Sequence, residues 1–372
     1  MAKKTLLYIN PGPTYRPHST LYQDEFIELS KTFNGFVFTS SPRNETIPIG
    51  DFTYLSMKSR YTKVDRLRFL FFCTWKAIKI LIGKGRIDLV STYDPLSTGL
   101  VGLIVSRIHG ARFCPAVNGV YTSPAQWIDG RDGLEKRVKK AILPIMMRFV
   151  LKHADGIRLL FKNQIDMLKD VTQDKIVYAF PPFVPTDRFK NLREEKEILF
   201  VGFPFKLKGV DILIKAFKKI SSKYPEWKLK ILGWYPNPEE LNNAIGVHPQ
   251  IYHHKPVPYE EMAQHIGSCG IFVLPSRSEA MGRVLVEAMA AGKPRIGSNV
   301  DGIPTVINNG IDGLLFQTED VDDLAEKLGL LMSDADLRRK LGEAGEIRAR
   351  QEFTRSNYFN NLINFYNEVL EK

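Results

Sequence analysis

The sequence contains few cysteines and no long uncharged apolar run. Its three cysteines, Cys73, Cys114 and Cys269, stand far apart and form no CxxC pair or Cys/His spacing, so neither a disulfide framework nor a zinc site is indicated. The nearest candidate for a membrane span, residues 141–151, contains Arg148 and is shorter than the roughly 18 residues that a spanning helix needs. The N-terminal residues lead into a strand-like segment rather than a signal peptide. We therefore expect a cytoplasmic protein in a reducing compartment that does not cross a membrane.

Acidic residues are scarce in the first half of the chain. Residues 1–190 contain 29 Lys and Arg against 16 Asp and Glu, a net charge of +13. The other 182 residues contain 23 Lys and Arg against 25 Asp and Glu, a net charge of −2. The whole excess behind the overall charge of +11 therefore lies in the first half. This asymmetry indicates two functional halves, one of which faces an anionic partner.

Strand-like and helix-like segments alternate in two series, a pattern typical of doubly wound parallel sheets. With 372 residues, 44% of them apolar, the chain is long enough for two separate cores. We expect an α/β protein with ligands at the carboxyl ends of its strands. A proline-rich and charged segment, residues 179–197, is the expected linker. The expected strands are residues 5–10, 35–40, 87–92, 112–119 and 155–160 in the first series, and 197–202, 228–233, 270–276 and 293–298 in the second.

The segment LFVGFPFKLKGVDILIKAF, Leu199–Phe217, reads as a strand, a glycine turn and a helix with helically spaced apolar residues. The turn carries Lys206 and Lys208. Lysines at the carboxyl edge of a parallel sheet can neutralise phosphate oxygens. A solvated basic loop would give the same pattern, so the segment alone leaves both interpretations open.

A second segment, SEAMGRVLVEAMAAGKPRIGS, places a helix between a buried strand and Gly292, with Pro294 just beyond its end. Glu279 precedes this helix and Glu287 lies in its second turn. Free N–H groups at the helix start would favour an anion, and the two glutamates could accept hydrogen bonds from hydroxyl pairs on either side of it. Alone, Glu287 could equally be a carboxylate on a helix surface.

Taken together, the motifs VGxxxxxKGVDxLIxAF, PSxxExxGxxxxEAMAxGKP and DGIPTVINNGIDGLLF resemble the retaining glycosyltransferases of family 4 (group 1 type) over residues 198–316. In the first half, only the strand order and the junction at residues 182–189 match. The resemblance implies the GT-B fold: two Rossmann-like doubly wound domains facing across a cleft, with a C-terminal helix crossing back to the first domain. We place an acceptor domain at residues 1–185, a nucleotide-sugar domain at 186–352 and the returning helix at 353–372.

The resemblance also implies roles for the residues at the motif positions. Glu279 would hold hydroxyls of the donor sugar, Lys208 the diphosphate and Glu287 the ribose, while residues 255–257 would lie near the base. The helix start at Gly282 would face the phosphates. The expected donor-binding residues are Gly202, Lys206, Lys208, Glu279, Met281, Gly282, Arg283, Val284 and Glu287, of which Glu279 and Lys208 are the expected catalytic residues; the expected acceptor-side residues are Gly12 and Asn118.

Three positions depart from the family pattern. Phe203 stands where the family often has Arg after the VG pair, and Lys206 or the Arg283 side chain could supply the missing charge. Asn118 stands where the family commonly has His. The first loop, NPGPTYRP, has the single glycine Gly12 where paired glycines are usual. These departures concern the acceptor side more than the donor side.

No metal or other cofactor is expected. The one Asp-x-Asp triplet, at residues 334–336, lies in a helical stretch, and the histidines at 248, 253 and 254 do not form a convincing ligand set. Charge on the departing diphosphate would be met by Lys208 and helix N–H groups. The resemblance implies retention of configuration, by same-face attack in which the leaving phosphate takes the acceptor's proton.

The basic first half carries two runs of cations mixed with large apolar residues, at 58–86 and 131–153. A helix with cations on one side and aromatics on the other can lie in the headgroup region of an anionic membrane; a core helix with a basic outer face would show the same pattern. The membrane-contact candidates are Arg66, Arg68, Phe72, Trp75, Lys76 and Lys79.

We therefore expect a peripheral enzyme at the inner face of the cell membrane. It would transfer a sugar from a UDP- or GDP-sugar to a lipid-linked saccharide or glycolipid in surface-polysaccharide biosynthesis. The alternatives are a soluble acceptor, or a non-catalytic protein of the same fold that binds a membrane or nucleic acid. No nucleic-acid recognition motif is present, so no nucleic-acid partner is expected.

Overall fold

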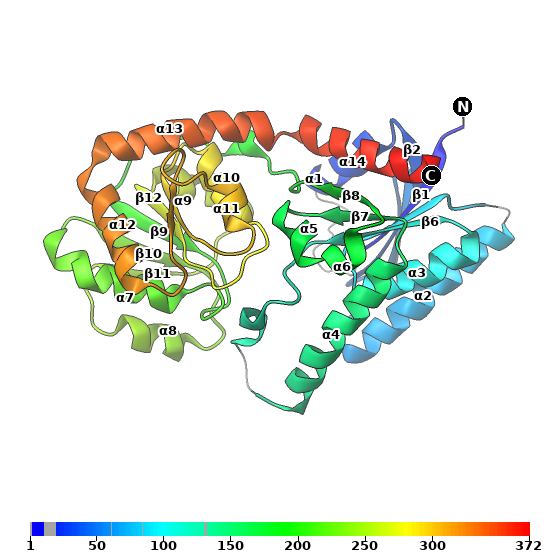
Figure 1. Ribbon diagram of the computed structural model, residues 1–372, viewed down its shortest axis with the longest axis horizontal. Coiled ribbons are helices and arrows are strands. Elements are labelled where there is room, and N and C mark those ends of the chain that lie inside the picture. Colours follow the sequence, from blue (N-terminus) through cyan, green and yellow to red (C-terminus); the bar gives the residue numbers. More distant parts are fainter. Residues whose placement is uncertain (1, 11–19, 61, 84, 130–131) are drawn as a thin grey trace. The chain divides into compact units, whose positions relative to one another are not determined.

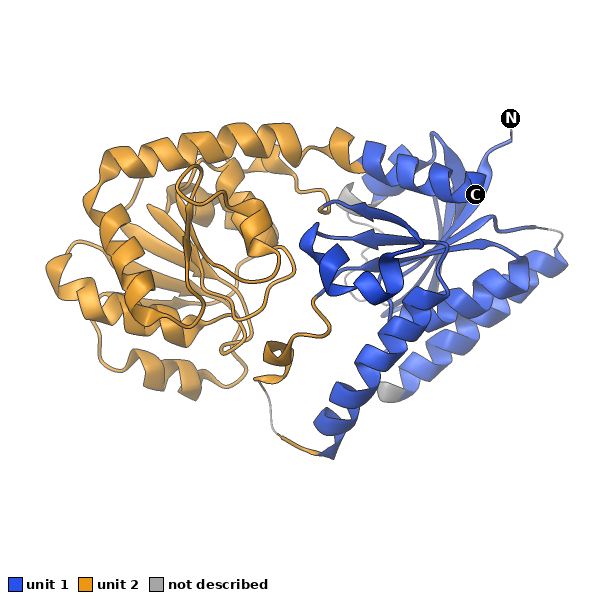
Figure 2. Ribbon diagram, in the orientation of Figure 1, with its two compact units in different colours: residues 1–119, 134–180, 359–372 blue, residues 120–133, 181–358 orange. Residues whose placement is uncertain are grey.

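The computed structural model describes residues 2–10, 20–60, 62–83, 85–129 and 132–372 (Figure 1). The chain forms two compact units. Unit 1 comprises residues 1–119, 134–180 and 359–372, and unit 2 comprises residues 120–133 and 181–358 (Figure 2). Each unit thus combines segments that are distant in the sequence.

Unit 1 is built on an eight-stranded sheet in the order β3-β4-β2-β1-β5-β6-β7-β8. Its neighbouring strands are parallel except for β3 and β4, which are antiparallel. The strands are β1 (Lys4–Ile9), β2 (Phe33–Ser41), β3 (Glu45–Ile49), β4 (Phe52–Lys58), β5 (Leu89–Thr92), β6 (Arg112–Val117), β7 (Gly156–Leu159) and β8 (Ile176–Ala179). The helices are α1 (Thr20–Leu29), α2 (Lys63–Ile82), α3 (Ser97–His109), α4 (Leu134–Lys152), α5 (Asn163–Met167), α6 (Lys169–Thr172) and most of α14 (Arg355–Glu371).

Helix α2 begins at a capping box. The hydroxyl of Thr62 accepts a hydrogen bond from the N–H of Asp65, and the Asp65 carboxylate accepts one from the N–H of Thr62. This reciprocal pair satisfies two N–H groups that the first turn of a helix otherwise leaves without partners. Helix α3 contacts both α2 and α4, and the three helices lie side by side in Figure 1.

The C-terminal helix α14 packs on unit 1, which confirms the predicted return to the first domain. The Tyr366 hydroxyl donates a hydrogen bond of 2.9 Å to Oγ of Ser91. At Gly156, an added Cβ would lie 2.5 Å from a methyl group of Val369 and 2.9 Å from the ring of Phe365. The helix therefore sits too close to β7 for any larger residue at position 156.

Unit 2 is built on a six-stranded parallel sheet in the order β11-β10-β9-β12-β13-β14. On one side of the central strand β9 (Glu197–Val201) lie β10 (Lys228–Leu232) and then β11 (Ile251–His254). On the other side of β9 lie β12 (Ile271–Leu274), β13 (Arg295–Ser298) and β14 (Leu314–Phe316). The chain thus leaves β9 and β12 in opposite directions, which makes their carboxyl ends the topological switch point of the sheet.

The helices of unit 2 connect these strands and complete the predicted doubly wound fold. The α-helices are α7 (Val210–Ile220), α8 (Pro238–Ile245), α9 (Tyr259–Ser268), α10 (Arg283–Ala290), α11 (Ile303–Val306), α12 (Val321–Ser333) and α13 (Ala335–Glu352), and the 3₁₀ helices are η1 (Pro124–Trp127), η2 (Thr186–Arg188) and η3 (Ser221–Lys223). Apolar residues of β9, β10 and β12 are buried in the core.

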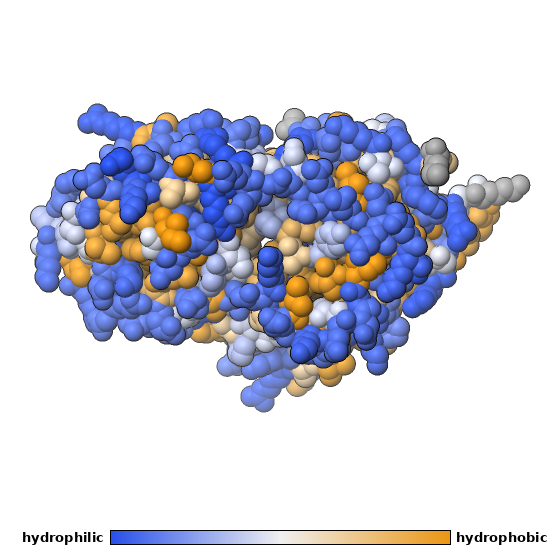
Figure 3. All heavy atoms as spheres, turned by 45° about the horizontal axis from the view of Figure 1, so that its top comes forward, coloured by the Kyte–Doolittle hydropathy of each residue, from blue (hydrophilic) through white to orange (hydrophobic). Residues whose placement is uncertain are grey.

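Hydrophilic residues dominate the face of the molecule shown in Figure 3, where apolar residues form separate patches.

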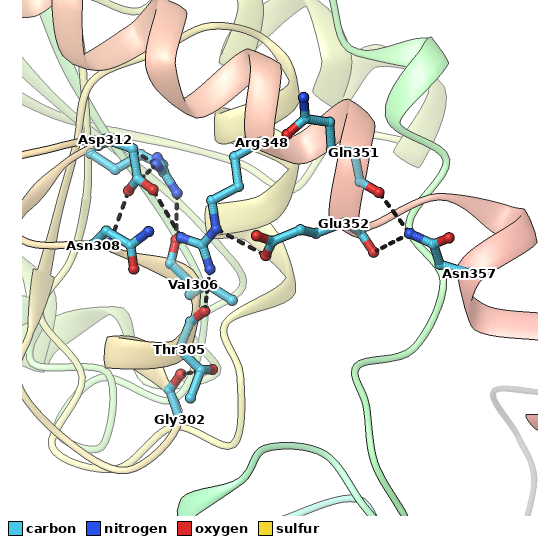
Figure 4. A network of polar contacts seen from close by, with 10 residues as sticks. Gly302, Thr305, Val306, Asn308, Asp312, Arg348, Gln351, Glu352 and Asn357 are labelled. Atoms are coloured by element: carbon cyan, nitrogen blue, oxygen red, sulfur yellow. Dashed lines mark hydrogen bonds and ion pairs between the residues drawn. The ribbon is translucent and has the colours of Figure 1, made fainter. Parts of the chain in front are cut away.

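A buried charge network holds α13 against β13 and the loop before β14 (Figure 4). Arg295 is completely buried and donates to the Asp312 carboxylate at 2.9 Å, and Arg348 donates to the other oxygen of Asp312 at 2.8 Å. Burial lowers the pKa of Arg295 to about 10, so this side chain is still charged at neutral pH. Because two guanidinium groups share one carboxylate, Asp312 is the central residue of the network.

Candidate functional site

Two loops meet at the switch point of the second sheet. Residues 202–209 follow β9, and residues 275–282 follow β12. Across the point where they meet, Nζ of Lys208 lies 2.5 Å from Oε2 of Glu279. Both side chains are largely shielded from water, with 20% and 14% of their surfaces exposed. The structure thus brings together the two residues that the sequence analysis selected as catalytic.

The β9 loop is held firmly against the β12 loop. Gly209 has a φ of 66°, and a Cβ there would lie 1.9 Å from the carbonyl oxygen of Pro275, so only glycine fits. The Arg277 guanidinium donates to both carboxylate oxygens of Asp211, at 2.8 and 3.0 Å, and also to the carbonyl of Lys206. Burial opposes ionisation of Asp211, but its bonds to Arg277 outweigh burial and lower its pKa. Arg277 is therefore a positioning residue that the sequence analysis missed.

Asp129 also fixes the β9 loop, and no sequence motif indicated it. Its carboxylate accepts hydrogen bonds from the backbone N–H groups of Lys206, at 3.0 Å, and Leu207, at 2.7 Å. The same short segment brings Gln126 within 3.3 Å of Oγ of Ser278 on the β12 loop. Residues 120–133 are accordingly part of unit 2, although they follow a strand of unit 1.

Helix α10 begins at Arg283, and Gly282, where the sequence analysis placed the helix start, is its N-cap. Gly282 has a φ of 76°, and a Cβ there would come within 3.0 Å of side-chain atoms of Leu274 and Leu285. Met281 is buried before the helix, and Val284 is half-buried in its first turn. As a glycine, the N-cap Gly282 offers no side-chain acceptor to the first N–H groups of α10.

Glu287 is almost completely buried, with 2% of its surface exposed. Its Oε1 accepts hydrogen bonds from the Tyr259 hydroxyl at 3.0 Å and from Nε of Arg283 at 3.1 Å, and Arg283 also donates to the Tyr259 oxygen. Burial raises the pKa of Glu287, although Arg283 opposes the shift. Burial also raises the pKa of Tyr259 to about 12, so its hydroxyl remains a donor.

The other predicted residues of this region lie around the same pair of loops. Gly202 directly follows β9, and a Cβ there would lie 3.6 Å from Cγ of Lys208, so the Lys208 stem passes beside it. The Lys206 ammonium lies 3.5 Å from Asp211 and 3.8 Å from Glu240. Its charge is therefore already partly neutralised within the protein.

On the acceptor side, Asn118 lies at the carboxyl edge of the first sheet. It follows β6, and its Nδ2 donates a hydrogen bond of 2.7 Å to the carbonyl oxygen of Tyr93, which follows β5. Gly12 lies outside the described residues. Asp94, next to Tyr93, is buried, and burial raises its pKa.

Of the membrane-contact candidates on α2, Arg66, Arg68, Trp75 and Lys79 are exposed, and Lys76 is half-buried. Phe72 is half-buried and packs against Phe38 and Phe69, with ring centroids 6.0 and 6.2 Å away. Its neighbour Phe71, in contrast, is 70% exposed.

Apart from Leu81, the exposed large apolar residues of α2 and α4 stand three, four or seven positions apart, so each set forms one stripe along its helix. They are Val64, Leu67, Phe71, Trp75 and Ile82 on α2, and Leu134, Val138, Ile142, Ile145 and Phe149 on α4. We call these the α2 stripe and the α4 stripe. No described helix is both long and apolar enough to span a membrane.

The second half of the chain is similar in sequence to known glycosyltransferases. Residues 184–348 match the family model of the glycosyl transferases group 1. An uncharacterised glycosyltransferase from Methanocaldococcus jannaschii is 36% identical over 152 residues, which cover 40% of this chain and 41% of that protein. The chain matches less than half the length of the first curated relatives.

Solved structures match nearly the whole chain. Sucrose-phosphate synthase from Thermosynechococcus elongatus superposes with a TM-score of 0.81 at 16% identity, covering 99% of this chain and 100% of that one. The HepE protein of Anabaena, solved in complex with UDP-glucose, gives a TM-score of 0.74 at 12% identity, covering 98% and 99%. At these identities the likeness shows the fold alone. The chain therefore has the GT-B fold of glycosyltransferases, and its residues 184–348 carry the sequence pattern of the group 1 glycosyl transferases.

Proposed function

We propose that the protein transfers a glycosyl residue from a nucleotide sugar, a UDP- or GDP-sugar, to an acceptor hydroxyl. The observation that carries this proposal is the close pair of Lys208 and Glu279 at the switch point of the second sheet. In open α/β sheets, ligands bind at this point, beyond the carboxyl ends of the strands. The match to group 1 glycosyl transferases over residues 184–348 supports the same site.

The residues of the pair suit the two ends of a sugar diphosphate. When donor is bound, the Lys208 ammonium would turn from Glu279 to the phosphate oxygens and stabilise the charge that develops on the leaving diphosphate. The Glu279 carboxylate would then accept hydrogen bonds from hydroxyls of the transferred sugar. The N–H groups at the start of α10 would meet the same phosphates.

Glu287 would hold the nucleoside end by accepting hydrogen bonds from the ribose hydroxyls. Its carboxylate is already held in one orientation by Tyr259 and Arg283. A buried carboxylate with fixed geometry discriminates strongly for hydroxyl donors, because losing them leaves a buried acceptor without a partner.

We further propose that transfer retains the anomeric configuration and needs no metal. The acceptor hydroxyl would attack from the face of the departing diphosphate, which would take up its proton. In this scheme Lys208 and the N–H groups of α10 supply the electrostatic stabilisation of the leaving group.

Calorimetric titration with UDP, GDP, ADP and their sugars tests the donor site, first without metal and then with magnesium. We expect micromolar binding of one nucleotide without metal, and its loss in Glu287→Ala. Glu343→Ala, on the surface of α13, is the matched control and should bind as wild type does. If wild type binds none of these ligands, the transferase proposal is wrong.

For the acceptor, we propose a lipid-linked saccharide or glycolipid, reached while the enzyme lies at the inner face of the cell membrane. The α2 and α4 stripes support this proposal, because apolar side chains flanked by cations suit the boundary between anionic headgroups and acyl chains. Helix α4 contains six Lys and Arg against the single acid Glu135, and α2 contains five against Asp65.

Sedimentation with lipid vesicles tests the membrane proposal. We expect the protein to bind vesicles containing phosphatidylglycerol, with binding weakened by salt, and not to bind neutral phosphatidylcholine vesicles. Phe71→Glu with Ile145→Glu should abolish binding, whereas Ile347→Glu, an exposed apolar position on α13, should leave it unchanged. Absence of binding to anionic vesicles would favour a soluble acceptor, and binding to DNA or RNA alone would favour a nucleic-acid surface.

A further inference from the structure

Two large aromatic side chains are exposed beside the candidate site. Phe203 follows β9 and is 42% exposed; Trp234 follows β10 and is 61% exposed. Their ring centroids are 5.4 Å apart at an interplanar angle of 54°. Large aromatic rings side by side at the carboxyl edge of a parallel sheet lie where ligands bind, yet none of the predicted donor-site roles uses them.

The surrounding residues hold this aromatic pair in place. Each ring follows a glycine, and a Cβ on Gly233 would lie 2.4 Å from the carbonyl oxygen of Gly202, so the two loops run in close contact. Beneath the pair, the buried Tyr235 packs edge-on against Phe203 at 6.2 Å and donates a hydrogen bond of 3.0 Å to the Gly202 carbonyl. The pair is therefore a preformed surface.

The strand order places the pair next to the cation of the site. Along the carboxyl edge, Glu279 follows β12, Lys208 lies in the loop after β9, and Trp234 follows β10. The Lys208 stem passes beside Gly202, the residue before Phe203. If Glu279 holds the sugar and Lys208 the diphosphate, the next group along this edge is the nucleoside. Residues 255–257, which are expected near the base, follow β11, the neighbour of β10.

We infer that Phe203 and Trp234 form a stacking platform for the nucleobase of the donor nucleotide, an inference that rests on the proposed function. Every nucleobase offers a flat π-face, and stacking on an aromatic side chain contributes to affinity without selecting one base by hydrogen bonds. The platform accounts for an aromatic residue at position 203, where the family often has a cation. It strengthens binding of any nucleoside diphosphate, and base selectivity comes from other groups.

The test compares ligands with and without a base. Calorimetry measures UDP, GDP, ADP and inorganic pyrophosphate on wild type, Phe203→Ala, Trp234→Ala and Trp234→Phe, with Trp75→Ala as the control at an exposed tryptophan of unit 1. We expect Trp234→Ala to weaken nucleotide binding about ten-fold, Phe203→Ala to weaken it by less, and Trp234→Phe to recover most of the loss. The affinity of each variant for pyrophosphate should stay within two-fold of the wild-type value, because pyrophosphate has no base to stack.

Fluorescence gives a second readout that does not depend on pyrophosphate. Nucleotide binding should quench tryptophan emission in wild type and in Trp75→Phe, but not in Trp234→Phe. Circular dichroism melting confirms that each variant is folded. The platform inference would be wrong if both alanine variants kept their nucleotide affinity, or if they lost affinity for pyrophosphate and for nucleotides equally. Either result would leave the proposed donor site standing. Failure of wild type to bind any nucleotide would instead overturn the proposed function itself.

Discussion

In unit 1, the two stripes of exposed apolar side chains stand on basic helices, whereas in unit 2 charged side chains lie inside the fold. Phe71 of α2 and Ile145 of α4 are each 70% exposed. In unit 2, Arg295 and Glu287 are at most 2% exposed. Both arrangements reverse the usual distribution of apolar and charged residues. Each arrangement therefore carries a cost in free energy that a structural or functional role must offset.

The roles that offset these costs differ between the units. In unit 2 the buried Asp312 has opposite charges within hydrogen-bonding distance, in Arg295 and Arg348, and the buried Glu287 has one in Arg283. In unit 1 the described residues leave the two stripes exposed, and in the membrane proposal an anionic bilayer covers them. The contrast matches the proposed roles, in which unit 2 recognises a small polar ligand and unit 1 an extended anionic surface.

The largest effect is expected for Asp312→Ala, which breaks the buried network of unit 2. Removing one partner of a buried ion pair typically costs about 3–5 kcal/mol, and here two arginines lose their shared carboxylate. Urea unfolding monitored by circular dichroism should show this loss. Asp322→Ala, which removes an exposed partner of Lys219, is the control and should cost less than about 1 kcal/mol. Similar losses in both variants would show that burial does not set the strength of the network.

A smaller effect is expected from titration of Glu287 in the candidate site. Burial raises its pKa above the ordinary value of 4.5, so on acidification it takes up a proton earlier than a surface glutamate does. Ribose hydroxyls need the ionised form as acceptor, so nucleotide affinity should fall as pH drops through this raised pKa. In Glu287→Gln, binding should be weaker at neutral pH by about 1.5–3 kcal/mol and should lose this pH dependence. Parallel pH profiles for the two proteins, measured by calorimetry, would contradict the role of Glu287.

The smallest effect is expected for Asp129→Ala, because Asp129 is only half-buried and water can replace part of its role. Two N–H groups of the β9 loop lose a charged acceptor, and the expected loss of stability is about 1 kcal/mol. Hydrogen exchange measured by mass spectrometry should speed up at Lys206 and Leu207. In Asp129→Asn, whose amide oxygen still accepts a hydrogen bond, exchange should be intermediate. Unchanged exchange in the alanine variant would show that the loop is held by Arg277 alone.

Much of the fold was predictable, because strands buried on both faces have continuous apolar sequences. All nine expected strands are present, among them β9 and β12, which flank the site. The missed strands are β3, β4, β8, β11 and β14. Strands β3, β11 and β14 lie at sheet edges, and β8 is half-buried along its length. Such strands lack a continuous apolar run, so periodicity alone does not identify them.

The candidate site was predictable where local motifs encode it and not where contacts between distant segments build it. Glu279 and Gly282 stand in one short motif, and the structure places both at the start of α10. Asp129 reaches the β9 loop from 77 residues away in the chain, and Tyr259 reaches Glu287 from 28 residues away. No spacing rule connects such residues, so only the folded chain reveals them.

The central claim is that unit 2 binds the nucleotide and unit 1 binds the anionic membrane surface. The most direct test measures both activities side by side in wild type, in Lys208→Ala and in the double variant Phe71→Glu with Ile145→Glu. We predict that Lys208→Ala loses nucleotide binding and keeps vesicle binding, while the double variant does the reverse. Loss of both activities in either folded variant, or of neither in both, would contradict this division of roles.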